Sequence, residues 1–244
     1  MREKEKGDMV DIDFGKKSKK IKVALVDDHA LFREGLRLVL DQFEDLKIIY
    51  EAINGKELFE KLVNGEPDVI FMDINMPDMD GLETTKRLRV HFPQIKIVIL
   101  TMHDEKRFII EMIKNGANGY LFKNVTPDEL YTSIKNVIEE GFYFNEFMTK
   151  ELHAGWSNRM GTAKLLKKVQ KLSQRDVTVL RLICQQNSSE QIGEKLRLSA
   201  RTVDNIRSQL LRRLRVKNTA GLVLYAIENG LVNLNISTRR KLTW

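Results

Sequence analysis

The chain has 244 residues, of which 42% are hydrophobic and 31% are charged, a composition typical of a globular protein with one large or two ordinary domains. Its single cysteine, Cys184, excludes an internal disulfide, and the sequence has no Cys/His cluster that would indicate a zinc site. The charged N-terminus lacks the apolar core of a signal peptide, and no stretch reaches the roughly 18 apolar residues that a membrane helix needs, so we expect a cytoplasmic protein with no membrane partner.

The net charge of +7 is unevenly distributed along the chain. Residues 21–140 hold 15 Lys and Arg against 22 Asp and Glu, a net charge of −7, whereas residues 171–231 hold 11 against 5, a net charge of +6. An acidic front half joined to a basic back half suggests a magnesium-using or regulatory module tethered to one that binds nucleic acid. Because surface charge can also serve solubility alone, the motifs must decide.

Strands and helices alternate along the front half of the chain. Apolar runs predict five strands, at residues 21–28, 47–53, 69–72, 95–101 and 119–124. Amphipathic segments predict a helix after each strand, over residues 30–43, 54–65, 81–92, 104–116 and 126–141, with Asn54, Asp80 and Thr126 as N-caps. This alternation predicts a doubly wound α/β fold with a five-stranded parallel sheet.

Polar side chains stand where four of these strands end. Asp27 and Asp28 end the first strand, Asp73 follows the apolar run VIFM of the third, Thr101 ends the fourth and Lys123 ends the fifth. The carboxyl ends of parallel strands meet at one edge of a sheet, so these groups should converge. Three clustered carboxylates repel one another unless their pKa values rise or a cation lies among them, and ligands that are all oxygen suit Mg²⁺.

This set of groups is suited to phosphoryl transfer. The Asp73 carboxylate can attack a phosphorus atom in line while Mg²⁺, Lys123 and Thr101 neutralise charge on the phosphoryl oxygens, and the product is an aspartyl phosphate. Each residue alone also has a plainer interpretation, since Asp27 can cap a strand end, Lys123 can be a solvated lysine and Thr101 can simply favour a strand.

Residues 21–140 resemble the receiver domain of a bacterial two-component response regulator, which has a flavodoxin-like fold. The resemblance rests on the Asp27–Asp28 pair, on Asp73 within DINMPDMDG, on Thr101 after an apolar strand and on Lys123 within GYLFKN. It implies that Asp73 takes a phosphoryl group from a phosphohistidine on a sensor histidine kinase or a phosphotransfer protein. Such a protein is not a conventional enzyme, because it catalyses only its own Mg²⁺-dependent phosphorylation and dephosphorylation.

The same resemblance implies roles for the residues around Asp73. Asp28, Asp73 and the backbone carbonyl of Asn75 would bind Mg²⁺, with Asp27 supporting the ion largely through water. Thr101 and Tyr120 would form a switch pair, in which Thr101 turns toward the phosphoryl group and the tyrosine ring reorients.

The segment 141–170 loses the α/β rhythm and is predicted to be a linker. Phe142, Phe144 and Phe147 either pack against the end of the front domain or start a linker helix. The Gly, Ser and Asn residues at 155–161 favour a flexible connection, and His153 is expected on its surface.

Residues 171–231 have a purely helical period and predict an all-α domain of four helices. Capping boxes start the first helix at Ser173 and the second at Ser188, the third follows Ser199, and the fourth spans 218–230. The tight turn before the third helix predicts a helix-turn-helix.

The segments LSQRDVTVLRLI, SSEQIGEKLRLSARTVDNIRSQLLRRL and LVLYAIENGLV resemble the LuxR-type helix-turn-helix domain, which implies double-stranded DNA as a partner. The residues that we expect to contact DNA are Arg201, Thr202, Asp204, Asn205, Arg207, Ser208, Arg212, Arg213 and Lys217. The family often has a basic residue where Asp204 stands, and Asp204 either is repelled by the phosphates or accepts a hydrogen bond from cytosine; we favour repulsion.

The sequence thus predicts a transcription regulator switched by phosphorylation. One helix-turn-helix reads a half-site, so we expect a homodimer in the active form, paired through residues 107–122 and 221–229, and a monomer or an occluded form without phosphorylation. A haloacid dehalogenase-type phosphohydrolase also uses an aspartyl phosphate, but it needs a general acid where this chain has Asn75. A DNA binder whose receiver serves only for dimerisation would not need the acidic cluster. Residues 1–20 and 232–244 are unassigned.

Overall fold

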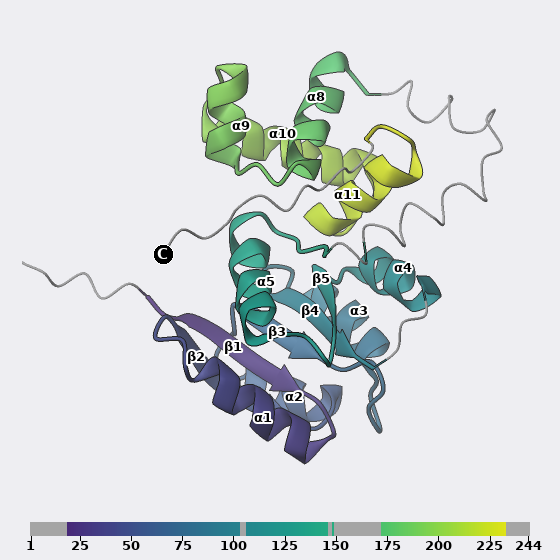
Figure 1. Cartoon of the computed structure of the whole chain (residues 1–244). Coiled ribbons are helices and arrows are strands. Elements are labelled where there is room, and N and C mark those ends of the chain that lie inside the picture. The colour runs from purple at the N-terminus through teal and green to yellow at the C-terminus, as the bar shows by residue number, and fades with distance from the viewer. Residues whose placement is uncertain (1–18, 103–105, 146–147, 149–171, 233–244) are drawn as a thin grey trace, which may run out of the picture.

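The computed structural model describes residues 19–102, 106–145, 148 and 172–232, without the side chains of residues 106 and 107. The first part of the chain alternates strands with helices, as predicted (Figure 1). The strands are β1 (Ile21–Val26), β2 (Leu46–Ala52), β3 (Val69–Met72), β4 (Lys96–Thr101) and β5 (Gly119–Phe122). The helices are α1 (Ala30–Leu40), α2 (Gly55–Leu62), α3 (Gly81–His91), α4 (Lys106–Asn115) and α5 (Pro127–Glu139).

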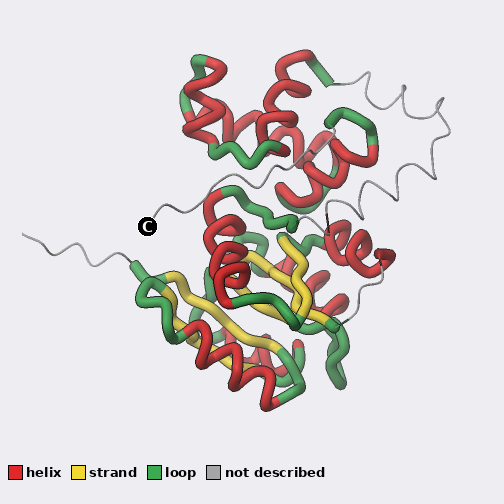
Figure 2. The backbone as a smooth tube through the Cα atoms, viewed as in Figure 1, coloured by secondary structure: helices red, strands yellow, loops and turns green. Residues whose placement is uncertain are grey.

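The five strands form one parallel sheet in the order β2-β1-β3-β4-β5. All four residues of β3 are buried, because helices cover both faces of the sheet. A strand that is covered on both faces is typically a continuous apolar run, as β3 is. One core lies between the sheet and helices α1 and α5, and a second lies between the sheet and helices α2, α3 and α4 (Figure 2). The predicted doubly wound α/β fold is confirmed.

The predicted helix starts are also confirmed at the level of side chains. Asn54, Asp80 and Thr126 each accept a hydrogen bond from the backbone N–H three residues on. These bonds satisfy donors that the first turn of a helix leaves without a partner. The first helix ends at Leu40 instead of residue 43, since residues 41 and 42 form a turn before β2.

The last described part of the chain, residues 172–232, is helical, as predicted. Its helices are α8 (Gln174–Cys184), α9 (Ser189–Leu196), α10 (Ala200–Leu214) and α11 (Thr219–Glu228). Both predicted capping boxes form, between Ser173 and Asp176 and between Ser188 and Gln191. Arg197 closes α9 in the left-handed conformation, and this sharp turn delivers the chain into α10 as a helix-turn-helix.

Phe142 and Phe144 pack against the end of the first domain instead of starting a helix. They are 1% and 2% exposed, and their rings meet edge to face at 5.3 Å. Tyr143 between them donates its backbone N–H to the carbonyl of Asn118, which places this segment beside β5. Phe147, His153 and the residues at 155–161 lie outside the described part of the chain.

The helical domain lies against the first domain through α11, which contacts α4 (Figure 1). Nine consecutive residues of α11, from Thr219 to Ile227, are buried. The core between the sheet and α4 therefore continues into the core of the helical domain. Among the described helices, none is long and apolar enough to cross a membrane.

Candidate functional site

The carboxylates predicted to converge do so at the carboxyl end of the sheet. One ligand atom each from Asp27, Asp28, His29 and Asp73 lies within 4.8 Å of every other. Asp27 and Asp73 are buried, at 3% and 5% exposed, while Asp28 and His29 lie at the surface. The cluster is thus closed on the protein side and open toward solvent.

Lys123 lies between the two buried carboxylates. Its Nζ is 2.7 Å from Oδ2 of Asp27 and 2.8 Å from Oδ2 of Asp73. Burial acts to lower the pKa of Lys123, but the hydrogen bonds to the two carboxylates outweigh it and the pKa lies above its ordinary value. Lys123 is therefore a fixed cation at the predicted nucleophile.

The cluster has an excess of negative charge. Among the described residues, the three carboxylates of Asp27, Asp28 and Asp73 outnumber the ammonium of Lys123, which contacts two of them. The donors are mainly oxygen atoms, which is the ligand set that hard divalent cations prefer. The residues therefore fit a divalent metal ion in both charge and chemistry.

The backbone holds Asp73 in a fixed position. Its N–H donates to the carbonyl of Val26 on the neighbouring strand at 2.8 Å, and its Oδ1 accepts from the N–H of Ile74 at 2.7 Å. The start of α3 lies so close that a Cβ on Gly81 would stand 2.3 Å from the carbonyl oxygen of Asp73. Only glycine fits at this approach of two backbone segments.

The remaining predicted residues lie at the same edge of the sheet or next to it. Thr101 ends β4 and is fully buried, and its carbonyl accepts from the N–H of Lys123 at 2.9 Å. Tyr120 is 1% exposed, and its ring packs edge to face on Phe122 at 6.0 Å. Asn75 is exposed in the loop that follows Asp73.

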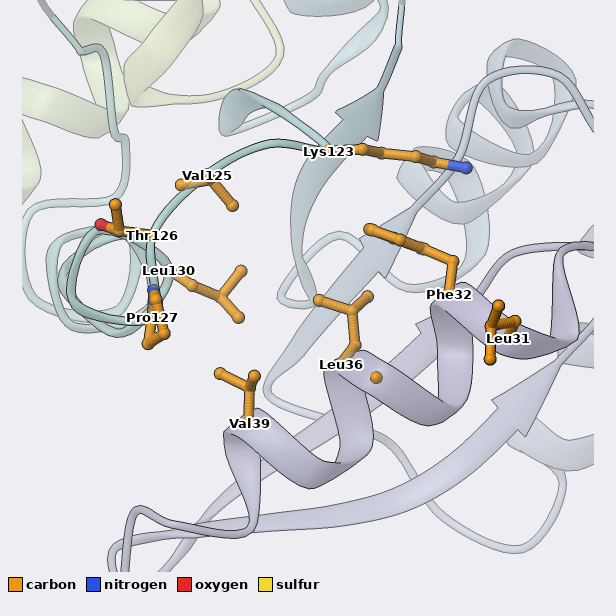
Figure 3. A pocket seen from close by; sticks show the side chains of 10 residues that line it. Leu31, Phe32, Leu36, Val39, Lys123, Val125, Thr126, Pro127 and Leu130 are labelled. Carbon is orange, nitrogen blue, oxygen red and sulfur yellow. The ribbon is translucent and has the colours of Figure 1, made fainter.

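Two neighbours of the site were missed by sequence reasoning. The Nδ1 of His29 is 2.9 Å from Oδ1 of Asp28, and Nζ of Lys123 is 4.7 Å from the centre of the Phe32 ring (Figure 3). Position gave a signal for His29, because it follows the acidic pair directly. Phe32 looked like an ordinary core residue of an amphipathic helix, and only the tertiary fold brings its ring to Lys123, which follows β5.

The helix-turn-helix carries a basic face, and three of the residues predicted to contact DNA make hydrogen bonds within the helical domain. Arg201, Asn205, Ser208, Arg212 and Lys217 are exposed, in keeping with their predicted positions. Arg213 is also exposed but donates to Asp176 of α8 at 2.8 Å, and Thr202 lies within the cap of α10, where its hydroxyl is 2.8 Å from that of Ser199. Asp204 accepts a hydrogen bond from the hydroxyl of Ser189 at the start of α9.

Arg207, predicted on the exposed face, is only half-exposed. Its Nε and Nη2 are buried and have no hydrogen-bond partner in the described part of the chain. Burial lowers the pKa of Arg207, although the negative charges of Asp204, Glu140 and Glu190 act to raise it. Glu140 follows α5, so the domain-domain contact lies beside this arginine and part of its guanidinium is covered.

Asn218 is the most direct polar link between the two domains. Its Nδ2 donates to the carbonyls of Gly116 at 2.7 Å and Ala117 at 3.1 Å, both between α4 and β5. Nearby, Lys114 of α4 pairs with Glu228 of α11 at 2.8 Å. The two segments proposed for dimer contacts, around α4–β5 and α11, thus cover each other within one chain.

Arg89 supports the Gly116 carbonyl from the other side. Its guanidinium donates to that carbonyl at 2.7 Å, to the carbonyl of Ile95 at 2.6 Å and to Oδ1 of Asn118 at 2.7 Å. Burial lowers the pKa of Arg89 to about 10. The loop before β5 is therefore bonded both to α3 and to the helical domain.

A parallel sheet with an acidic cluster at its carboxyl edge, joined to a basic helix-turn-helix, defines a receiver coupled to a DNA-binding domain. The family model "Response regulator receiver domain" matches residues 23–135, and "Bacterial regulatory proteins, luxR family" matches residues 170–226. The chain belongs to the two-component response regulators of this class, which are phosphorylation-dependent transcription regulators and not conventional enzymes.

The two sequence relatives span most of the chain, and the solved structure covers about half of it. It is 32% identical to "Transcriptional regulatory protein DegU" of Brevibacillus brevis over 88% of this chain and 96% of that protein. It is 31% identical to "Oxygen regulatory protein NreC" of Staphylococcus carnosus (strain TM300) over 87% and 100%. A solved LuxR-family response regulator from Aurantimonas sp. SI85-9A1 is 28% identical with a TM-score of 0.51, over 55% of this chain and 95% of that one.

Proposed function

We propose that Asp73 is the phosphoryl acceptor of this response regulator and that its phosphorylation controls DNA binding. The observation that carries the proposal is the ammonium of Lys123 held at 2.8 Å from Asp73, beside two further carboxylates. An oxygen of Asp73 attacks phosphorus, the bond from phosphorus to the histidine nitrogen of the donor breaks, and an aspartyl phosphate forms.

Each residue around Asp73 has a distinct part in that reaction. Asp27, Asp28, Asp73 and the backbone carbonyl of Asn75 would hold Mg²⁺, which supplies positive charge to the phosphoryl oxygens when bound. Lys123 neutralises the transferred group from the other side. The Thr101 hydroxyl, at the end of the neighbouring strand, then has a new acceptor toward which it can turn, with Tyr120 as the second half of the switch.

The labelling experiment uses acetyl phosphate as the donor. We expect labelling with Mg²⁺ and none with EDTA, an alkali-labile product, and no labelling of Asp73→Ala. Full labelling of that variant, seen by intact mass, or labelling that EDTA leaves unchanged, would contradict the assignment.

We also propose that the described arrangement is the form with low affinity for DNA. Arg207 of the recognition helix is half-buried beside the receiver, with its Nε and Nη2 covered, and α11 is packed on α4. This arrangement restricts the contacts of Arg207 with DNA and of α11 with a second copy. Phosphorylation would favour separation of the domains, pairing of two copies and contact of the basic face with DNA.

The proposed division of labour on the recognition helix follows from its exposure. The exposed cations Arg201, Arg212 and Lys217 would bind phosphates, and the exposed amide of Asn205 would read adenine. Arg207 would join them only after the domains separate. Arg213 forms an ion pair with Asp176 and would act mainly by holding α10 against α8.

A further inference from the structure

A groove of about 440 Å³ opens beside the acidic site, between α1 and the start of α5. Figure 3 shows Lys123 at one end of it, with the Phe32 ring beside the lysine side chain and the side chains of Leu36, Val39 and Leu130 farther along. The groove is mostly apolar, so Lys123 is its main charged group.

We propose that Phe32 is a positioning residue for the phosphoryl site and that its ring face keeps the Lys123 ammonium over Asp73. This inference rests on the proposed function of Asp73. The ring centre is 4.7 Å from Nζ, within the range of a cation–π interaction. The same ammonium contacts Asp27 at 2.7 Å and Asp73 at 2.8 Å, so its two carboxylates and the ring hold it together.

The need for such a group follows from what happens to the partners of Lys123. When Asp73 accepts a phosphoryl group, the ammonium must exchange a carboxylate oxygen for a phosphoryl oxygen. A hydrogen-bonding partner would compete with that exchange, whereas attraction to a ring face is not directional in this way and lets the ammonium shift a short distance. Without the ring, Asp27 remains the lasting partner of the ammonium during the exchange, and the long side chain of Lys123 spends more time turned toward the groove and away from Asp73.

A role in packing alone does not account for this placement. Phe32 is only partly buried and lines an open groove, so a leucine would satisfy the contacts with its apolar neighbours. A leucine has no π-face. Lys123 itself keeps only 6% of its side chain exposed, and a desolvated cation gains more from an aromatic ring than an exposed one does.

The test replaces Phe32 by phenylalanines that carry one, two or three fluorine atoms on the ring, in the full-length protein. Fluorine withdraws electrons from the ring face and changes its shape little, so it weakens the attraction for a cation and leaves the packing nearly intact. The rate constant for labelling by acetyl phosphate with Mg²⁺ should fall stepwise, to about one fifth for the trifluoro ring.

Three substitutions by natural amino acids complete the series. Phe32→Leu should show the same loss as the trifluoro ring, Phe32→Tyr should stay within about twofold of wild type, and Leu38→Ala, at an exposed position of the same helix, should leave the rate unchanged. The position of Lys123 is read separately from its Hε resonances by NMR, which the ring current of Phe32 should shift upfield in the wild type but not in Phe32→Leu.

The outcomes separate the two proposals. Equal rates along the fluorine series in a protein that is phosphorylated, or Lys123 Hε resonances at ordinary lysine positions, would refute the role of Phe32 and leave Asp73 as the acceptor. A wild type that takes no phosphoryl group at all would refute the proposed function and this inference with it.

Discussion

Asn218 offers a single substitution that separates the contact between the domains from the stability of α11. Its Oδ1 caps α11 by accepting from the N–H of Gly221 at 3.0 Å, while its Nδ2 bonds the carbonyls of Gly116 and Ala117 across the interface. Serine is an equally good N-cap but has no amide donor. Asn218→Ser therefore removes both bonds between the domains and keeps the helix start.

The expected size of the effect comes from the two lost bonds. A neutral hydrogen bond contributes about 0.5–1.5 kcal/mol net, so the closed arrangement should lose about 1–3 kcal/mol. That corresponds to a shift of about 5- to 150-fold toward separated domains. If DNA binds only the separated form, the affinity of the unphosphorylated protein should rise by the same factor as long as the closed form remains in excess.

The assay combines small-angle scattering with fluorescence anisotropy on a duplex selected from random DNA by the protein. We expect Asn218→Ser to be more extended than wild type and to bind more tightly without phosphorylation. Asn115→Ser is the matched control, because the amide of Asn115 bonds the carbonyl of Glu111 within α4. If Asn218→Ser scatters like wild type and binds DNA equally, the contact does not restrain the domains.

Three further substitutions test single contacts. Burial acts to raise the pKa of Asp176, but hydrogen bonds, one of them from Arg213, outweigh it and lower the pKa below its ordinary value of 3.8. The stabilisation from these bonds is therefore fully present above pH 3.8 and is lost as the pH falls through the lowered pKa of the folded protein. Asp176→Asn should thus lower the free energy of unfolding by about 1 kcal/mol at neutral pH, and thermal melts should show that the gap closes in strong acid. Asp204→Ala, which frees the hydroxyl of Ser189, should tighten binding to selected and random DNA alike and alter the salt dependence of both; a loss confined to the selected duplex would show that Asp204 reads a base. Gly81→Ala should destabilise the receiver by about 1–3 kcal/mol because of the clash beside the acidic site, and an unchanged melting temperature would contradict it.

The site within the receiver was predictable because each of its parts is a local signal. A strand that ends in Asp27, Asp73 or Lys123 shows in the sequence as an apolar run followed by a charge, and the parallel sheet brings these ends together. The same holds for the capping boxes, which depend on residues three apart.

The contact between the domains was not predictable in this way. Arg207 stands four residues after the buried Val203 and three before the buried Leu210, so helical periodicity places it beside the apolar face of α10. The periodicity does not show that the receiver then covers part of its guanidinium. Asn218 similarly shows only its capping role in the sequence. Its second role depends on two carbonyls a hundred residues away, as the separations of 102 and 101 residues show.

We propose that a phosphoryl group on Asp73 turns a closed chain into a DNA-binding dimer. The most direct measurement is light scattering together with affinity for the selected duplex, with and without beryllium fluoride and Mg²⁺, for wild type and Asp73→Ala. We predict that beryllium fluoride doubles the mass of the wild type and tightens its binding to DNA, and that it changes neither property in the variant. Identical mass and identical affinity of the wild type in both conditions would contradict the claim.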